Sequence, residues 1–469
     1  MTSSPVAGIV ALIRHGDRQG FYQSPTTYTA SHTNLTVLGY LQELNSGAQL
    51  RSLYLNSSSP SAIQGIDVNL AENLQVSVQA DAGGEGGVIV ESANAFMQGL
   101  FPPFNDTLTL ANGTTVSWDT RAQLIPVETI EPDQSWVMEP WTSCDNFDDW
   151  TNSFYTSDAF KAQSKIAQPF YDSLPSTLLN NRPKTLVNAW NVFDFLNVER
   201  IHNATLSSDI SSDTLSNALS WAEYHESGVF SSSEESSIGN IAGRGILTPL
   251  TEAITDVANT SNPLKVSVLA ASYKPFFSLF SMFQIDALQG HLVDYASSMV
   301  FQIHQDNTIQ LYFRNGSYGS YDAYPLLKSD SMSVADFSSH FNQYKIDTLA
   351  EWCNVCGETS ARGCDTLNAL NGTGSGSKYS DVTSTVGKHQ VSPVVAGVIG
   401  ALVSLALALV LVALVSFLTG LTVVKRSKAG AYTRRNHLLA PGSTSTVHRQ
   451  DNSVELRSNI DRKDSHLTA

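Results

Sequence analysis

The sequence predicts an α/β domain with a central, mostly parallel sheet flanked by helices, a helical cap insertion and one C-terminal transmembrane helix. In the first 130 residues, short apolar stretches alternate with stretches of helical periodicity, a pattern typical of α/β layer folds. Residues 146–257 break this alternation, because they are mostly helical in pattern and rich in aromatic side chains. Residues 394–424 form a run of 31 residues without a charge, which exceeds the length that a bilayer core requires.

The elements of the sheet domain follow from hydrophobic patterning. Residues 6–13 are apolar and rich in valine and isoleucine, as in a strand that is buried on both faces. The first helix begins at Thr36, whose side chain is placed to cap it. The other predicted strands are residues 74–80, 122–129 and 264–271, the predicted helices are 36–54, 88–100 and 274–284, and residues 298–316 are predicted to form a hairpin that turns at Asp306 and Asn307.

We expect a single-pass membrane protein with four segments. They are an ectodomain at residues 1–370 that contains the cap at 146–257, a flexible linker at 371–392, a transmembrane helix at 393–424 and a disordered basic tail at 425–469. Lys425, Arg426 and Lys428 directly follow the apolar run, and positive residues mark the cytosolic side of a membrane helix. The ectodomain is therefore expected to be extracellular or lumenal, and the short C-terminal tail cytosolic.

The formal net charge of −16 is unevenly distributed along the chain. The tail contains nine Lys and Arg against four Asp and Glu, a net charge of +5, so the rest of the chain carries −21. Such an acidic ectodomain disfavours nucleic acid as a partner, because nucleic acid binding requires a basic surface. The expected partners are the membrane, through one helix, and a small molecule, and the sequence does not indicate an oligomeric state.

Glycosylation acceptors also favour an extracytosolic ectodomain. All Asn-X-Ser/Thr tripeptides of the chain precede the tail, as expected if only that side meets the glycosylation machinery. The eight candidate sites are Asn34, Asn56, Asn105, Asn112, Asn203, Asn259, Asn315 and Asn371.

The four cysteines also lie in the ectodomain. Their even number predicts two disulfides in an oxidising compartment, without indicating which cysteines pair. The alternative is a zinc site built from three of them at tolerable ligand spacing, which this compartment disfavours. The cysteines are Cys144, Cys353, Cys356 and Cys364. We otherwise expect no metal and no cofactor.

The first residues do not read as a usual signal peptide. They lack a positive segment, and their apolar stretch of about eight residues is short. Because a long ectodomain must be led across the membrane, we expect that the natural N-terminus precedes this sequence.

The candidate catalytic residues follow the first strand, in the sequence Arg14-His15-Gly16-Asp17-Arg18. The carboxyl ends of strands are where α/β sheets bind ligands. Guanidinium groups offer forked donors that match phosphate oxygens, and a neutral imidazole between them can attack phosphorus and hold it covalently. The pattern therefore predicts a phosphate site in which His15 is catalytic and Arg14 and Arg18 bind phosphate.

This motif and two later stretches resemble the histidine phosphatase superfamily in its acid phosphatase branch. Residues 33–55 are similar to that branch's helix with Thr-x-x-Gly and Leu-Arg elements, and residues 91–103, "ESANAFMQGLFPP", to its Ser-Ala helix. The resemblance covers residues 6–370 and looks closest to fungal members tethered by a C-terminal membrane helix. It implies a phosphoglycerate-mutase-like fold, His15 as nucleophile and Arg14 and Arg18 as phosphate ligands.

Two elements of the family pattern are missing. A third arginine normally precedes the Ser-Ala helix, near Val88, but no arginine occurs between Arg51 and Arg121. The family also has a phosphate-binding His and a proton-donating Asp after a late strand. At that place, after the predicted strand 264–271, the chain has Ser272-Tyr273-Lys274.

Two readings of the site follow, a rebuilt site and a remnant. In a rebuilt site, the backbone N–H groups of the loop with Gly83, Gly84, Gly86 and Gly87 form an anion nest before a helix. Lys274 then replaces the charge of the missing histidine, and Glu85 or Asp81 serves as the acid. In a remnant, loss of the acid alone lowers the rate by roughly 10²–10⁴.

Two functions follow from these readings. The first is a membrane-anchored phosphomonoesterase that acts on a phosphorylated small molecule through a phosphohistidine at His15. The alternative is a pseudophosphatase that serves as a membrane-tethered binding or scaffold glycoprotein. A mutase is disfavoured, because mutases of this superfamily are usually cytosolic and need a fuller site.

Overall fold

The structure is a computed structural model that describes residues 4–82, 86–118, 121–130 and 135–372. The chain divides into two compact units, residues 1–376 and 377–469, and the second unit lies outside the described residues. The expected transmembrane helix, the tail and all but the start of the linker therefore also lie outside them. Among the helices that are described, none combines the length and the apolar character needed to cross a membrane.

The first strand, β1, lies at the centre of the sheet. The strand order is β10-β8-β7-β1-β6-β2-β5, and β9 pairs with β8 outside this path. The four strands β1, β6, β2 and β5 are parallel, whereas β7 and β8 continue the sheet in antiparallel pairing. The strand bounds are β1 Val6–Arg14, β2 Val76–Asp81, β5 Glu128–Ile130, β6 Val266–Ala271, β7 Ser298–His304, β8 Thr308–Arg314, β9 Asp322–Tyr324 and β10 Met332–Ser333. The carboxyl ends of β1, β6 and β2 therefore lie along one edge of the sheet.

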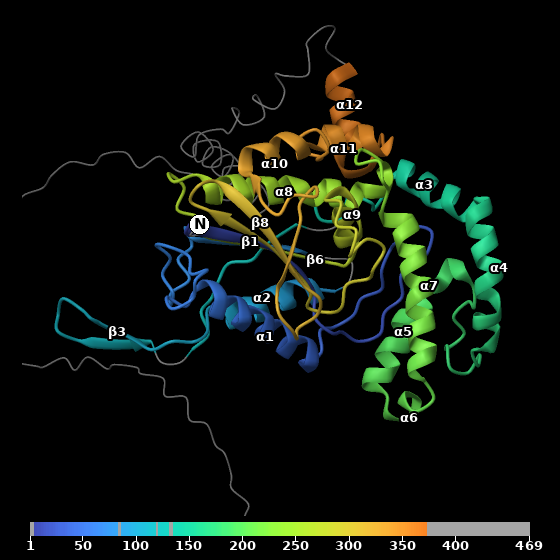
Figure 1. The fold of residues 1–469 in the computed structure, drawn as a ribbon, viewed down its shortest axis with the longest axis horizontal. Coiled ribbons are helices and arrows are strands. Elements are labelled where there is room, and N and C mark those ends of the chain that lie inside the picture. The colour runs from blue at the N-terminus through green and yellow to red at the C-terminus, as the bar shows by residue number, and fades with distance from the viewer. Residues whose placement is uncertain (1–3, 83–85, 119–120, 131–134, 373–469) are drawn as a thin grey trace, which may run out of the picture. The chain divides into compact units, whose positions relative to one another are not determined.

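Helices cover both faces of this sheet (Figure 1). Two helices, α1, Val37–Tyr54, and α2, Val88–Leu100, pack on one face of the sheet. Two others, α8, Ile241–Ala258, and α9, Lys274–Met282, pack on the opposite face. Successive side chains of β1 point to opposite faces, so that Ala11 and Ile13 join the core below α1 and α2 while Leu12 joins the core below α8. Burial on both faces explains why β1 is almost continuously apolar, as predicted.

The cap consists of helices between β5 and α8, with a hydrophobic core of its own. Figure 1 shows these helices beside the sheet domain. They are α3 Asp145–Thr156, α4 Asp158–Ser173, α5 Ala189–His202, α6 Ala204–Ser207 and α7 Ser212–Phe230. The next helix, α8, contacts β1, β6 and β7 and so belongs to the sheet layer, although its residues fall within the expected cap at 146–257.

Several elements match the predicted bounds, and others were not predicted. The helix α2 has the bounds expected from the sequence, and Thr36 caps α1 by accepting a hydrogen bond from the backbone of Gly39. The predicted strand at 122–129 is formed only as the short β5. The hairpin of β3, Asp106–Thr109, and β4, Thr115–Trp118, was not predicted, and all its residues are exposed.

The cysteines form the two disulfides that were expected. Cys144 pairs with Cys356, and Cys353 pairs with Cys364, so the alternative zinc site is not formed. The first bond joins the start of α3 to α11, Leu349–Cys356, and the second joins α11 to α12, Cys364–Gly372. Both helices follow α10, Val334–Phe341. In the described part of the chain, no cluster of His, Cys, Asp and Glu could hold a metal ion.

Most glycosylation candidates lie where a glycan has room. Asn203 is half-buried, because its side chain caps α6 and contacts Glu199. The side chain of Asn371 is outside the described residues. The exposed candidates are Asn34, Asn56, Asn105, Asn112, Asn259 and Asn315.

Candidate active site

The Arg-His-Gly motif begins at the last residue of β1 and is held by backbone bonds on both sides. The N–H of Arg14 donates to the carbonyl of Ser297 at 2.9 Å, and the N–H of His15 donates to that of Ala271, the last residue of β6, at 3.3 Å. The carbonyl of His15 accepts from the N–H of Ala296 at 3.0 Å. His15 is thus fixed at the carboxyl edge of the sheet, as predicted.

Gly16 lets the first two helices approach the motif. A Cβ atom at this position would lie 2.5 Å from the carbonyl oxygen of Gly39 in α1, so a larger residue would push the helix away. The N–H of Gly16 donates to the hydroxyl of Ser92 in α2 at 3.1 Å, and the N–H of Asp17 donates to the side chain of Gln42 at 2.8 Å. Contact with α1 and α2 therefore sets the turn after His15.

The imidazole of His15 is held in one orientation by the motif itself. Its Nδ1 lies 2.8 Å from the carbonyl oxygen of Gly16, and because a carbonyl only accepts, Nδ1 carries the proton. Burial lowers the pKa of His15 well below its usual value, and the charges of Arg14 and Arg18 lower it further. The ring is therefore neutral, and a neutral imidazole that carries its proton on Nδ1 has on Nε2 the lone pair that a nucleophile requires.

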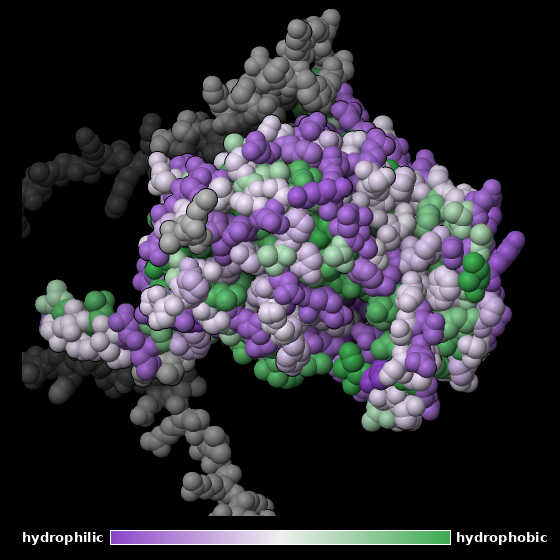
Figure 2. Space-filling view, viewed as in Figure 1, coloured by the Kyte–Doolittle hydropathy of each residue, from purple (hydrophilic) through white to green (hydrophobic). Residues whose placement is uncertain are grey.

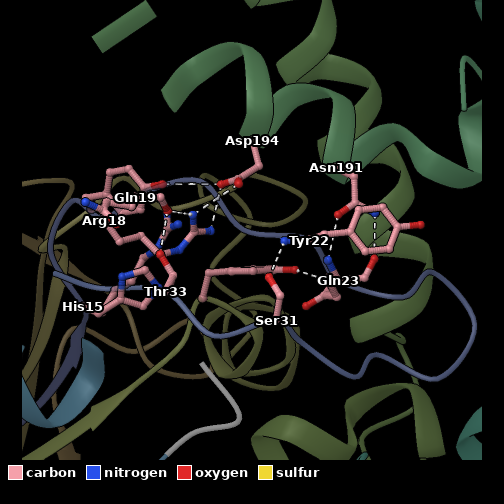
Figure 3. A network of polar contacts seen from close by, with 12 residues as sticks. His15, Arg18, Gln19, Tyr22, Gln23, Ser31, Thr33, Asn191 and Asp194 are labelled. Atoms are coloured by element: carbon pink, nitrogen blue, oxygen red, sulfur yellow. Dashed lines mark hydrogen bonds and ion pairs between the residues drawn. The ribbon is translucent and has the colours of Figure 1, made fainter. Parts of the chain in front are cut away.

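The two arginines of the motif are buried beside His15 but have different partners. The guanidinium of Arg18 makes a two-pronged ion pair with Asp194 of α5, with N–O distances of 2.8 and 3.2 Å (Figure 3). Arg14 donates to the carbonyl of Val293, and its guanidinium lies 4.5 Å from the ring centre of Tyr295. Burial lowers the pKa of Arg14, although the group remains a cation at any pH of interest.

Tyr295 and Asp194 are site residues that sequence reasoning missed. The ring of Tyr295 lies 5.6 Å from that of His15, centre to centre, and its hydroxyl donates to Asp194 at 3.4 Å. Burial raises the pKa of Tyr295 to well above that of free tyrosine, so the hydroxyl keeps its proton. No sequence pattern assigns either residue to the site, because both are far from the motif along the chain.

Lys274, the tentative substitute for the missing histidine, is buried near enough to His15 to affect its pKa. It follows β6 at the start of α9 and is buried, and its positive charge contributes to the lowered pKa of His15. Its ammonium lies 5.0 Å from the ring centre of Trp141 and 5.2 Å from that of Tyr273. No carboxylate of the described residues lies within ion-pair distance of it. A buried cation without a counter-ion is costly, and an anionic ligand would lower that cost.

The glycine loop is described only in part. Residues 83–85, which include the tentative ligand Gly84 and the candidate acid Glu85, lie outside the described residues. Gly86 has φ of +87°, and a Cβ there would lie 2.8 Å from the carbonyl oxygen of Thr33, so this position requires glycine. Asp81, the other candidate acid, is buried at the carboxyl end of β2.

A chain of buried polar groups links the cap to the end of β6. The hydroxyl of Tyr273 donates to Glu226 of α7 at 2.7 Å and accepts from Gln23 at 3.2 Å. Glu226 also lies 2.8 Å from the Nδ1 of His225, whose Nε2 lies 2.8 Å from the hydroxyl of Tyr155. The place of the expected His-Asp pair is thus taken by residues that join the cap to the sheet domain.

Comparisons with known proteins identify the family of the chain. A sequence model of the histidine phosphatase superfamily (branch 2) matches residues 19–315. The chain is 24% identical to the lysosomal acid phosphatase of Xenopus laevis over 322 residues, which cover 66% of this chain and 69% of that protein. It is 23% identical to the prostatic acid phosphatase of Bos taurus over 329 residues, which cover 68% and 79% of the two chains.

Solved structures show the same fold at low sequence identity. The phytase from Citrobacter braakii is 14% identical and superposes with a TM-score of 0.51, over 74% of this chain and 99% of that one. The Klebsiella sp ASR1 phytase is 12% identical, with a TM-score of 0.50 over 73% and 97%. The matched region of the family covers more than half of the sequence, and the chain therefore belongs to branch 2 of the histidine phosphatase superfamily.

Proposed function

We propose that the protein hydrolyses phosphomonoesters through a covalent phosphohistidine at His15. The observation that carries this proposal is a buried, neutral imidazole whose Nδ1–H is bonded to Gly16 between two arginines. The acid phosphatases among the relatives support the same reaction class. The alternative, a pseudophosphatase that only binds, is favoured by one observation, the missing third arginine and His-Asp pair.

The reaction follows from the chemistry of these residues. Nε2 of His15 attacks phosphorus as the bond to the ester oxygen breaks, and the leaving oxygen takes up a proton from solvent, which is returned when water is consumed in the second step. Water then attacks the phosphohistidine, which releases inorganic phosphate and restores the neutral ring. Arg14 and Arg18 hold the phosphoryl oxygens by charge-assisted hydrogen bonds, and we assign Lys274 to the remaining negative charge.

The first prediction is turnover of an aryl phosphate that depends on both His15 and Lys274. The full chain, purified in detergent, is assayed with para-nitrophenyl phosphate from about pH 3 to about pH 8, beside His15→Ala, Lys274→Met and Lys274→Arg. We expect His15→Ala to abolish turnover and Lys274→Met to raise KM about 10-fold or more, since a hydrogen bond to a charged group contributes about 1.5–3 kcal/mol. Lys274→Arg keeps the charge and should recover part of the loss.

The pH profile gives a second readout of the same proposal. Because the pKa of His15 lies well below that of free histidine, the ring stays neutral as the pH falls through about 6.5, and kcat/KM should not fall there. Folded protein with turnover equal to that of His15→Ala at every pH would instead establish the pseudophosphatase.

We also propose that the protein is a single-pass glycoprotein of the fungal, membrane-anchored kind, with residues 1–370 outside the cytosol. The uncharged run at 394–424, the basic residues after it and the position of all glycosylation candidates before it support this orientation. The second prediction is that the full chain stays with membranes in alkaline carbonate and gains mobility after endoglycosidase treatment. A chain that carbonate releases, and that carries no glycan, would contradict the proposal.

A further inference from the structure

Two cavities with shared walls lie between the cap and the loop that precedes β7, and Arg14 lines the smaller of them. The smaller has a volume of about 50 Å³ and the larger about 360 Å³. Both are lined by Leu219, Leu292, Val293 and Asp294. They share these four residues, the smaller also borders Arg14, and we call the two cavities together the side passage. Hydrophilic residues predominate on the face of the molecule seen in Figure 2.

The inner end of the side passage carries a donor suited to phosphate. Arg14 lines the smaller cavity and is 5% exposed. Its buried Nε–H has no hydrogen-bond partner among the residues that the structure describes. Two carboxylates, those of Asp194 and Asp294, also line the smaller cavity, so a cation beside the phosphate ligand Arg14 would find negative charge there.

The outer end of the side passage is acidic. Asp294 is exposed there, and its carboxylate is bonded only to a neutral amide, that of Asn315 at 3.2 Å, among the described residues. Glu223, Asp322 and His291 line the larger cavity. The carboxylate of Glu223 lies 3.2 Å from Nδ1 of His291 and accepts from the backbone of Leu292 at 3.1 Å. Apart from Arg14, no lysine or arginine of the described chain lines either cavity.

Aromatic side chains form the walls between these two ends. Trp190, Phe193 and Tyr295 line the smaller cavity, and ring faces attract cations by about 0.5–1 kcal/mol at exposed sites. The smaller cavity admits about four water-sized groups, which matches a short aminoalkyl chain. A leaving group with further phosphates would instead meet the carboxylates of Asp294 and Glu223.

We propose that the preferred substrates are phosphomonoesters whose leaving group carries a positive charge, with the ammonium in the side passage. This inference rests on the proposed function, because it assumes that His15 cleaves the ester. In the simplest case, the P–O bond of O-phosphoethanolamine is hydrolysed, and water supplies the hydroxyl of phosphate and the proton of ethanolamine. Nothing else is consumed.

The test compares two esters that differ only in the charge at the far end. The full chain in detergent is assayed with O-phosphoethanolamine and with hydroxyethyl phosphate, which has the same number of heavy atoms and a neutral end. We expect kcat/KM to be about fivefold or more higher for the amine, and the ratio to fall with added salt. Inositol hexakisphosphate should be the poorest substrate of the three.

Variants of the side passage locate the effect. Asp294→Asn and Glu223→Gln should each lower the ratio of the two kcat/KM values about two- to fivefold, as expected for partly exposed ion pairs. Asp209→Asn removes an exposed carboxylate of the cap that lines neither cavity, and should leave the ratio unchanged.

The outcomes separate this inference from the proposed function. Equal or faster hydrolysis of the neutral ester overturns the inference and leaves the phosphatase intact. A preference for the amine that Asp294→Asn and Glu223→Gln do not change overturns its assignment to the side passage. If neither ester nor para-nitrophenyl phosphate is hydrolysed, the proposed function fails and the substrate preference fails with it.

Discussion

Glu43 is a carboxyl group in α1 that is fully buried although the proposed reaction does not use it. Neither carboxyl oxygen has a hydrogen-bond partner among the described residues. Burial raises the pKa of Glu43 well above its usual value, and the nearby charge of Arg314 only partly opposes this rise. Glu43 is therefore protonated in the folded protein at pH values where it is ionised in the unfolded chain.

The third prediction concerns the pH dependence of stability at Glu43. Between the unfolded and folded pKa values, the folded state binds one more proton, so the free energy of unfolding falls as pH rises. Glu43→Gln cannot titrate, and its stability relative to the wild type should improve by about 1.4 kcal/mol per pH unit above about pH 4.5. Urea unfolding at about pH 4, 5.5 and 7 measures this, with the exposed Glu72→Gln as the control. Parallel stability curves for Glu43→Gln and wild type would rule out a neutral Glu43.

Residues of the site differ in how far the sequence could assign them. Arg14, His15 and Arg18 lie within five consecutive residues, and their chemistry at the end of an apolar strand suffices to predict a phosphate site. Asp194 is 176 residues from its partner Arg18, and only packing of the cap brings them together. Lys274 could be predicted only in part. Its position after β6 indicated a role in the phosphate site, but its burial is visible only in the structure.

At the scale of elements, the sequence predicts the buried strands and helices but not the strands at the edge of the sheet or on the surface. The strands β1 and β6 carry apolar side chains on both faces, so their sequences are constrained throughout. The edge strand β5 and the exposed hairpin of β3 and β4 bury little, so polar and apolar residues are both tolerated and no pattern results. Locally, that hairpin is indicated by the glycine of its turn, Gly113, whose φ of +83° is one that glycine adopts readily.

Helices of the cap also depend on contacts that a local pattern does not contain. The boundary between cap and sheet domain falls before α8, because α8 packs on β1 and β7 whereas α7 reaches the end of β6 through Glu226 and Tyr273. Most residues of α8 are buried, whereas α7 is buried mainly toward its C-terminal end. Which face each helix covers is therefore decided by tertiary packing rather than by periodicity.

At the scale of the whole molecule, the two disulfides constrain very different lengths of chain. The bond Cys144–Cys356 joins residues that are 212 apart in the sequence, whereas Cys353–Cys364 joins residues that are 11 apart. In the chain-entropy account, a cross-link stabilises the folded state by reducing the freedom of the unfolded chain, and more so for a longer loop. The first bond should therefore contribute about 5 kcal/mol and the second about 3 kcal/mol.

The last prediction compares two double variants that remove these bonds separately. Cys144→Ala with Cys356→Ala should lower the free energy of unfolding more than Cys353→Ala with Cys364→Ala, by about 2 kcal/mol, in urea unfolding of the purified chain. Alanine is chosen because Cys144, Cys356 and Cys364 are buried, and a serine hydroxyl there would need a partner. A single unfolding transition is expected for both pairs if the cap and sheet domain unfold together. Equal losses would mean that native-state contacts of the α11–α12 segment, and not loop length, determine the contribution of each bond.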